Sequence, residues 1–145
     1  MSAVSTYESR PGILNSPVED IYDFVTDIRN FKQFIPAGSF SDIKVDRDSC
    51  SFNAGMLGEI NLRISEKLNP GHVIFSGYAR QVNDFSINLD LKESVKGKSE
   101  VKVFLSAAMN PMLKMMAEEP LKQFLNKLID EMEKFDGWKN RFQGK

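Results

Sequence analysis

The chain has 145 residues, of which 41% are hydrophobic and 27% are charged, and its formal net charge is −1. This length fits one domain with a sizeable core, and the composition excludes an intrinsically disordered chain. Basic and acidic residues number 19 and 20, so the sequence lacks the excess of positive charge that is typical of nucleic-acid-binding proteins.

The first part of the chain predicts a strand, a break and a capped helix. Residues 4–9 alternate weakly between apolar and polar types and predict a strand, which the Pro-Gly pair at 11–12 interrupts. The run 16–19, Ser-Pro-Val-Glu, predicts a capping box, because the serine hydroxyl and the glutamate carboxylate can each accept a free amide. We expect this helix to begin at Pro17 and to fade near Asn30.

Beyond a short helical turn that Pro36 ends, the pattern changes to a period of two. Apolar and polar residues alternate, or both faces are partly apolar, over six segments: 42–46, 51–56, 59–65, 72–79, 85–92 and 101–107. Such sequential strands with short turns predict an antiparallel meander with one apolar face. Glu66 would share that apolar face if the parity of its strand holds, or would lie beyond the edge of the core.

After Asn110-Pro111 the period returns to that of a helix. A broad apolar stripe follows Pro120, where we expect a kink or a fresh helix start because proline has no backbone amide to donate. Gly137 is the expected C-cap, and residues 138–145 are expected to form a short tail.

The order of these elements predicts a fold. A sheet with one apolar face must cover it, and the C-terminal helix is the only predicted element long enough to do so. We therefore expect one α+β domain over residues 1–145, a helix-grip fold. A curved antiparallel sheet wraps around the long C-terminal helix, with short helices after the first strand. Such curvature leaves a space between the helix and the sheet.

This element order resembles that of the START-like superfamily over essentially the whole chain. Residues 16–28, Ser-Pro-Val-Glu-Asp-Ile-Tyr-Asp-Phe-Val-Thr-Asp-Ile, continued by Phe34-Ile35-Pro36, look like the first helix of that family. Residues 110–113 are similar to the start of its terminal helix. The polyketide-cyclase and coenzyme-Q-binding branches look nearest. The resemblance implies an apolar cavity under the terminal helix, and it carries over no catalytic residue.

Few residues have the chemistry of a catalytic or metal site. His72 is the only histidine and lies at a predicted hairpin end, and Cys50 is the only cysteine. Neither has a second histidine or cysteine with which to hold a metal. We expect His72 to be a surface turn residue and Cys50 to be a structural thiol. The sequence therefore predicts no catalytic residue, no metal site and no cofactor.

The predicted ligand-binding residues share the apolar face of the sheet or the stripe of the terminal helix. They are Leu62, Phe75, Leu89, Val103, Met112, Met116, Phe124 and Leu128. The two methionines belong to a group of four at the start of the terminal helix. Their flexible thioether side chains could adapt to ligands of varied shape, or could simply fill the core.

We expect the chain to bind or carry a small hydrophobic ligand, such as a lipid, a quinone or a polyketide-like molecule. A polyketide cyclase or aromatase is one alternative, although it would need acid–base groups inside the cavity. A protein-interaction module whose own side chains fill the cavity is another. We expect no nucleic-acid partner, no stable membrane insertion and a cytoplasmic location, since no apolar run could span a bilayer and no secretion signal is evident.

Overall fold

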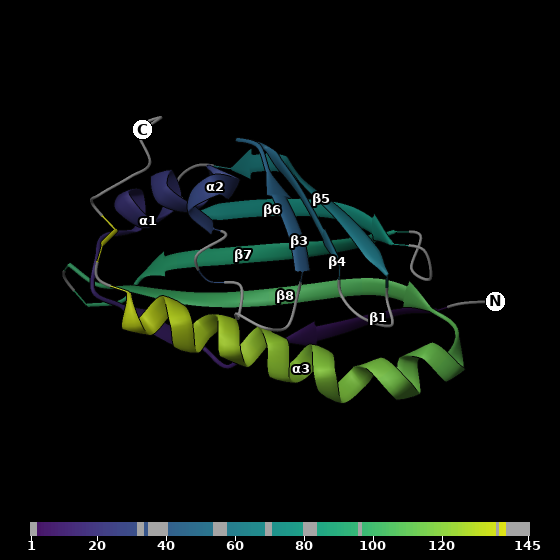
Figure 1. Cartoon of the computed structure of the whole chain (residues 1–145). Helices are drawn as coiled ribbons and strands as arrows, with labels where there is room; N and C mark the ends of the chain where they lie inside the picture. The colour runs from purple at the N-terminus through teal and green to yellow at the C-terminus, as the bar shows by residue number, and fades with distance from the viewer. Residues whose placement is uncertain are drawn as a thin grey trace.

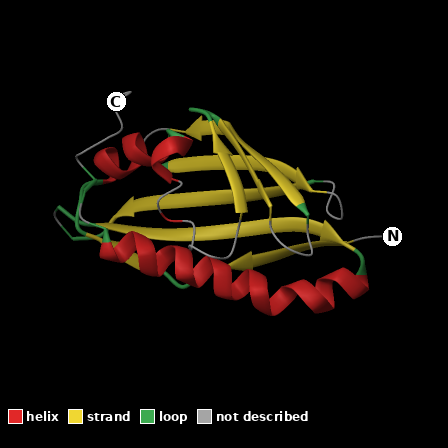
Figure 2. Ribbon diagram, in the orientation of Figure 1, coloured by secondary structure: helices red, strands yellow, loops and turns green. Residues whose placement is uncertain are grey.

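In the residues that it describes, the computed structural model has one antiparallel sheet and three helices (Figures 1 and 2). It describes residues 3–31, 34, 41–53, 58–68, 71–79, 84–95, 97–135 and 137–138. The elements in chain order are β1 (Ala3–Glu8), β2 (Gly12–Leu14), α1 (Val18–Val25), α2 (Ile28–Phe31), β3 (Ser41–Val45), β4 (Ser49–Asn53), β5 (Glu59–Leu68), β6 (His72–Ala79), β7 (Phe85–Glu93), β8 (Ser99–Met109) and α3 (Pro111–Lys134). The predicted α+β helix-grip fold is confirmed.

The strands from β3 to β8 form a meander, and β1 closes the far edge. The sheet order is β1-β8-β7-β6-β5-β4-β3, with β2 also pairing with β8. The first strand therefore lies beside the last one, which leads directly into α3. In Figure 1, α3 runs along β8 and β1, whereas β3 and β4 cross in front of the other strands. The order of the strands in the sheet thus differs from their order in the chain: β1 lies at one edge beside β8, and β3 lies at the other.

The break predicted at 11–12 is a kink between two strands that share one neighbour. Ser9 lies in the kink and exchanges hydrogen bonds with Val103, donating its amide over 2.8 Å and accepting at its hydroxyl over 3.0 Å. Gly12 then resumes the pairing opposite Val101. A Cβ at Gly12 would stand 2.6 Å from the Ile129 side chain, so glycine lets this strand approach α3 closely.

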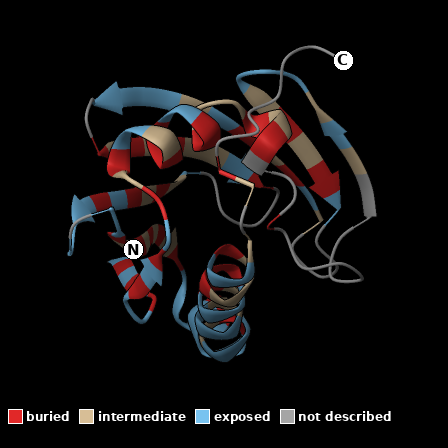
Figure 3. Ribbon diagram, turned by 90° about the vertical axis from the view of Figure 1, so that its left-hand side faces the viewer, coloured by how far each residue is buried: buried red, intermediate tan, exposed pale blue. Residues whose placement is uncertain are grey.

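One face of the sheet is buried by the helices, and the other faces solvent. Alternate residues of β8 from Ser99 to Met109 are buried, as the period of two predicts. The register carries the same face across the sheet, because Val73 pairs with Leu89 and Leu89 pairs with Val103. Figure 3 looks along α3 and shows the exposed side of this helix turned away from the sheet. We call the covered side the inner face and the solvent side the outer face.

A β-bulge changes the face of Glu66. Ile64 pairs with Phe75, but the next pair joins Glu66 to Ile74, so β5 contains one extra residue at this point. Each extra residue reverses the alternation beyond it. Glu66 is exposed on the outer face, so of its two expected alternatives the one that places it on the face of Ile64 is wrong.

The predicted capping box is also wrong. Helix α1 begins at Val18, its N-cap residue is Pro17, and no side chain caps it. Ser16 precedes the N-cap by one residue. Its carbonyl instead accepts a hydrogen bond from the Ser99 hydroxyl over 2.6 Å, which ties the approach to α1 to the start of β8.

The helix expected to reach Asn30 is two helices, because Asp27 starts a new one. The Asp27 carboxylate accepts the Arg29 amide over 3.0 Å, as an N-cap does, and pairs with the Arg29 guanidinium at 2.6 Å. Burial alone would raise the pKa of Asp27, but the hydrogen bonds from Arg29 outweigh it and lower that pKa below its ordinary value.

Helix α3 begins as predicted and ends differently. The Asn110 side chain accepts the Leu113 amide over 2.8 Å, and the helix continues through Pro120 without a fresh start. Its C-cap residue is Phe135 rather than Gly137. Trp138 is 1% exposed, so the predicted tail begins inside the core. Pro36, the strand residues 54–56, the turn residues 69–70 and the tail residues 139–145 lie outside the described residues.

Candidate functional site

Most of the predicted ligand-binding residues meet on the inner face. Leu62, Phe75, Leu89, Val103 and Leu128 belong to the buried core, with exposed fractions between 0% and 6%. Phe124 is half-buried and packs against the same core. The structure therefore brings six of the eight residues together between the sheet and α3. Their contact with a ligand stays a prediction.

The other two predicted residues lie elsewhere. Met112 and Met116 are 73% and 53% exposed, so the prediction that they face the space under α3 is wrong. The buried stripe of α3 passes through Leu113 and Ala117 instead, one position later than each of these methionines. One residue of a helix turns the side chain by about 100°. An apolar residue type was therefore a poor guide to the buried side of this half of the helix.

A rim of half-buried apolar side chains borders the core, and most of it was missed by the sequence analysis. Its members come from β3, β5, β7 and α3, and each packs against the core while keeping part of its surface exposed. They are Ile43, Val45, Ile64, Phe85, Leu121 and Phe124. The period-of-two pattern identified the strand members as apolar. It did not show that they would be only partly covered.

Aromatic rings fill the inner face near the C-terminal end of α3. Phe135, Trp138, Phe24 and Phe34 come from three parts of the chain, and their ring centroids lie 5.0–6.0 Å apart. These distances are those of well-packed aromatic pairs. This end of the inner face is therefore a filled core.

A contrasting part of the inner face carries small side chains. The register aligns Ser5, Ala107, Phe85 and Gly77 across four strands. A Cβ on Gly77 would meet the Phe85 ring at 2.6 Å, so that ring leans over the glycine and away from Ala107. Ser5 and Ala107 are nonetheless only 9% and 4% exposed, so α3 and the neighbouring strands cover this part of the inner face.

Tyr7 stands next to these small residues in β1 and brings a polar group into the apolar layer. It is 6% exposed and pairs with Leu105, and the same row continues through Ile87 and Phe75 to Ile64 in the rim. Its hydroxyl is buried and has no hydrogen-bond partner among the described residues. A buried hydroxyl without a partner costs about 1–3 kcal/mol, so such a group calls for an explanation.

The remaining candidates for chemistry have structural explanations. Cys50 is buried, and burial raises the pKa of its thiol to about 11, which keeps it protonated near neutral pH. His72 lies on the outer face at the start of β6, where its Nδ1 is 2.9 Å from the Asp90 carboxylate. In the part of the chain that the structure describes, no three His, Cys, Asp or Glu side chains gather as a metal site would require.

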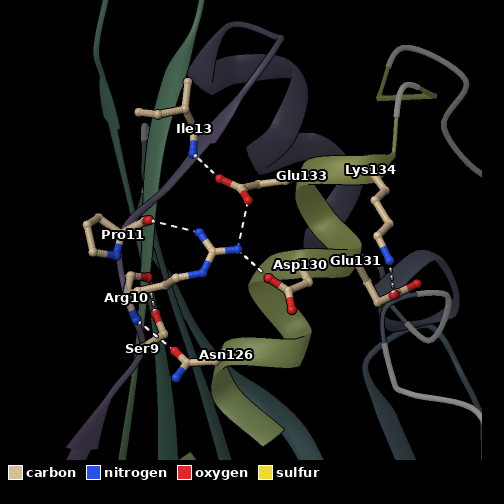
Figure 4. Close-up of polar contacts among 9 residues, drawn as sticks. All are labelled: Ser9, Arg10, Pro11, Ile13, Asn126, Asp130, Glu131, Glu133 and Lys134. Carbon is tan, nitrogen blue, oxygen red and sulfur yellow. Dashed lines mark hydrogen bonds and ion pairs between the residues drawn. The ribbon is translucent and has the colours of Figure 1, made fainter. Parts of the chain in front are cut away.

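A polar cluster fastens the C-terminal half of α3 to the kink between β1 and β2 (Figure 4). The Arg10 guanidinium pairs with Asp130 and, at 2.8 Å, with Glu133. Glu133 also accepts the Ile13 amide over 3.0 Å, and Asn126 accepts the Arg10 amide over 2.9 Å. The hydrogen bond from Arg10 lowers the pKa of Glu133 against the opposing effect of its partial burial. This cluster sets the position of α3 over the sheet.

A groove of about 620 Å³ crosses β3 to β6, and most of its lining residues belong to the outer face, although Val45, Cys50 and Leu62 also border it. Polar residues such as Lys44, Asn61, Arg63 and Ser76 line it, together with Tyr78, which is 59% exposed. Polar groups would have to lose water if an apolar molecule occupied this groove. The inner face is therefore the better candidate for an apolar ligand.

None of the helices in the described part of the chain is at once long enough and apolar enough to cross a membrane. No protein-family model matches the sequence, and no curated protein matches it.

Solved structures show the fold of the chain at low sequence identity. Norcoclaurine synthase from Thalictrum flavum matches with a TM-score of 0.72 and 10% identity, over 92% of this chain and 86% of the synthase. The protein XoxI from Bacillus cereus matches with a TM-score of 0.68 and 11% identity, over 91% of this chain and 94% of XoxI. Ara h 8.0201 matches with a TM-score of 0.56 and 14% identity, over 91% of this chain and 97% of its own. The chain therefore has the helix-grip fold that these solved structures share.

Proposed function

We propose that this protein binds a small apolar ligand on the inner face, between α3 and the strands β3, β5 and β7. The observation that carries the proposal is the half-buried apolar rim defined above. Its members pack against the same core from the strands β3, β5 and β7 and from α3. Covering apolar surface of this kind is worth about 25 cal/mol per Å², so a ligand that covers the rim would gain affinity.

The chemistry of the inner face supports binding rather than catalysis. Among the described residues, the buried side chains that can ionise are Tyr7, Tyr22 and Cys50. General acid–base catalysis works best with groups whose pKa lies near the operating pH, and the Cys50 thiol lies well above it. Norcoclaurine synthase is an enzyme by its name, but 10% identity to it supports a shared fold and no shared reaction. We therefore propose a carrier or sensor for lipids, quinones or polyketide-like molecules.

A fluorescence titration with N-phenyl-1-naphthylamine, an apolar probe, tests the proposal. The wild type should show one saturable site. Leu121→Trp should weaken binding at least tenfold, because a wide ring on the rim would occupy the space that the probe needs. Met116→Trp is the matched control on the same helix, and it should leave binding unchanged because Met116 is 53% exposed.

Overpacking by a new ring can itself cost about 1–3 kcal/mol, so chemical denaturation of each variant must accompany the titration. Val45→Trp approaches the rim from β3 and gives an independent second test. Weakened binding in Leu121→Trp and Val45→Trp, with both variants folded, supports the proposal. A wild type that binds no probe would contradict it and would favour a core filled by its own side chains.

A further inference from the structure

The buried hydroxyl of Tyr7 is a polar group that the proposed function does not yet use. Its side chain belongs to the core of the inner face, and its hydroxyl has no partner among the described residues. Trp138 has the other buried polar atom of this kind. Its ring packs at steep angles against Phe24 and Phe135 in the aromatic cluster. Tyr7 lies outside that cluster.

The position of Tyr7 along α3 follows from the geometry of the two elements. β1 and α3 run side by side in the same direction (Figure 1), and Arg10 hydrogen-bonds to Asn126. Tyr7 lies three residues before Arg10, which is about 10 Å in an extended chain. The same distance spans about seven residues of helix. This geometry puts Tyr7 level with about residue 119, near the middle of α3.

The residues next to Tyr7 on the inner face have small side chains. Ser5 and Ala107 occupy the adjacent row with small side chains, and Ala117 belongs to the buried stripe of α3. The Phe85 ring leans toward Gly77. The Tyr7 hydroxyl, which has no partner among the described residues, thus lies next to small side chains of the inner face.

We infer that the Tyr7 hydroxyl donates a hydrogen bond to a carbonyl oxygen of the bound molecule, so that the site selects apolar ligands that carry a ketone, quinone or ester group. The inference rests on the proposed function and adds the ligand class. A ligand oxygen would give the buried hydroxyl the partner that the described residues do not supply, whereas a pure hydrocarbon would leave it without one.

Two ligands of nearly equal shape test this selectivity. 2-Acetylnaphthalene and 2-ethylnaphthalene differ in one carbonyl oxygen, and each can be titrated as a competitor against bound N-phenyl-1-naphthylamine. The wild type should prefer the ketone three- to tenfold more than its water-to-alkane partition predicts. Tyr7→Phe should abolish that preference and leave the affinity for the hydrocarbon unchanged. Tyr78→Phe, which removes an exposed hydroxyl from the outer face, should behave as the wild type.

The outcomes separate this inference from the proposed function. If both naphthalenes bind and Tyr7→Phe changes neither affinity, the selectivity is refuted while apolar binding stands. If no probe or naphthalene binds to the wild type, both proposals fail. The denaturation midpoint of Tyr7→Phe is a further readout. It should equal or exceed that of the wild type, and a clear decrease would show that the hydroxyl already has a partner within the protein.

Discussion

The two halves of α3 differ more than their common helical structure suggests. Before Pro120, only Leu113 and Ala117 are buried, and Met112, Met115 and Met116 are 53–82% exposed. After Pro120, four residues are buried to 1% exposure or less: Leu125, Leu128, Ile129 and Met132. The cluster of Arg10, Asn126, Asp130 and Glu133 also holds the second half alone.

The comparison shows which part of the helix is anchored and which part can yield. Pro120 has no amide to donate to the Met116 carbonyl, so the helical hydrogen-bond ladder is weakest at the boundary between the halves. Burial and polar contacts, rather than helix propensity, hold the second half in place. The first half covers the small side chains near Tyr7, where a ligand is proposed to bind. Access to the inner face should therefore require movement of this half.

We expect the largest difference in stability between two variants that each shorten one side chain, one in each half of α3. Leu128→Ala should destabilise the protein by about 2–5 kcal/mol, because it leaves a cavity at a position that is 1% exposed. Met115→Ala should change the free energy of unfolding by no more than about 0.5 kcal/mol, since Met115 is 82% exposed. Urea denaturation of both variants measures the difference. Equal losses would remove the distinction between the halves.

Replacing Pro120 should make the two halves of α3 more alike in stability. Pro120→Ala restores a backbone amide and removes a steric clash in the helix, which stabilises the folded state. It also gives the unfolded chain more conformational freedom, which opposes this gain. We expect a net stabilisation of about 1–2 kcal/mol. In the wild type, amides 116–119 should exchange hydrogen faster than amides 125–133. In Pro120→Ala the first group should become more protected. Equal exchange in both halves of the wild type would show that Pro120 is no boundary.

The smallest effect concerns the polar cluster and depends on pH. The pKa of Glu133 is lowered in the folded state, so its ion pair stabilises the protein above the unfolded-state value of about 4.3. That contribution disappears as the pH falls through the folded-state pKa. Because the cluster is partly exposed, Glu133→Gln should cost only about 0.5–1 kcal/mol at pH 7 and almost nothing near pH 2.

A matched variant of the same helix controls for the loss of charge. Glu131 pairs with Lys134 at 3.5 Å on the exposed side, so Glu131→Gln should change stability less than Glu133→Gln at pH 7. Thermal unfolding of both variants across this pH range measures the difference. A constant difference between wild type and Glu133→Gln at all pH values would contradict the assigned role of the ion pair.

The sequence by itself determined the order of elements, the meander and the long covering helix. The signals were periodic and strong: alternate residues of β7 and β8 face the core as the period of two requires, and Asn110 caps α3 directly before Pro111. Chain order also predicted the helix-grip fold, because one apolar face and one long apolar helix leave few arrangements. Six of the eight predicted ligand-binding residues follow from the same periodicity.

Only the tertiary structure decided where those patterns stop. The bulge in β5 moved Glu66 to the outer face, and its one extra residue leaves no mark in the alternation of residue types. Met112 and Met116 are apolar but exposed, because the packing of α3 on β8 selects one side of a helix half that offers apolar residues on several. The Tyr7 hydroxyl has no partner among the described residues, and the rim is half-buried. Both features depend on which residues distant in sequence come together. A local pattern contains no information about such contacts, because they arise only when the first strand, the curled edge of the sheet and the last helix enclose the same space.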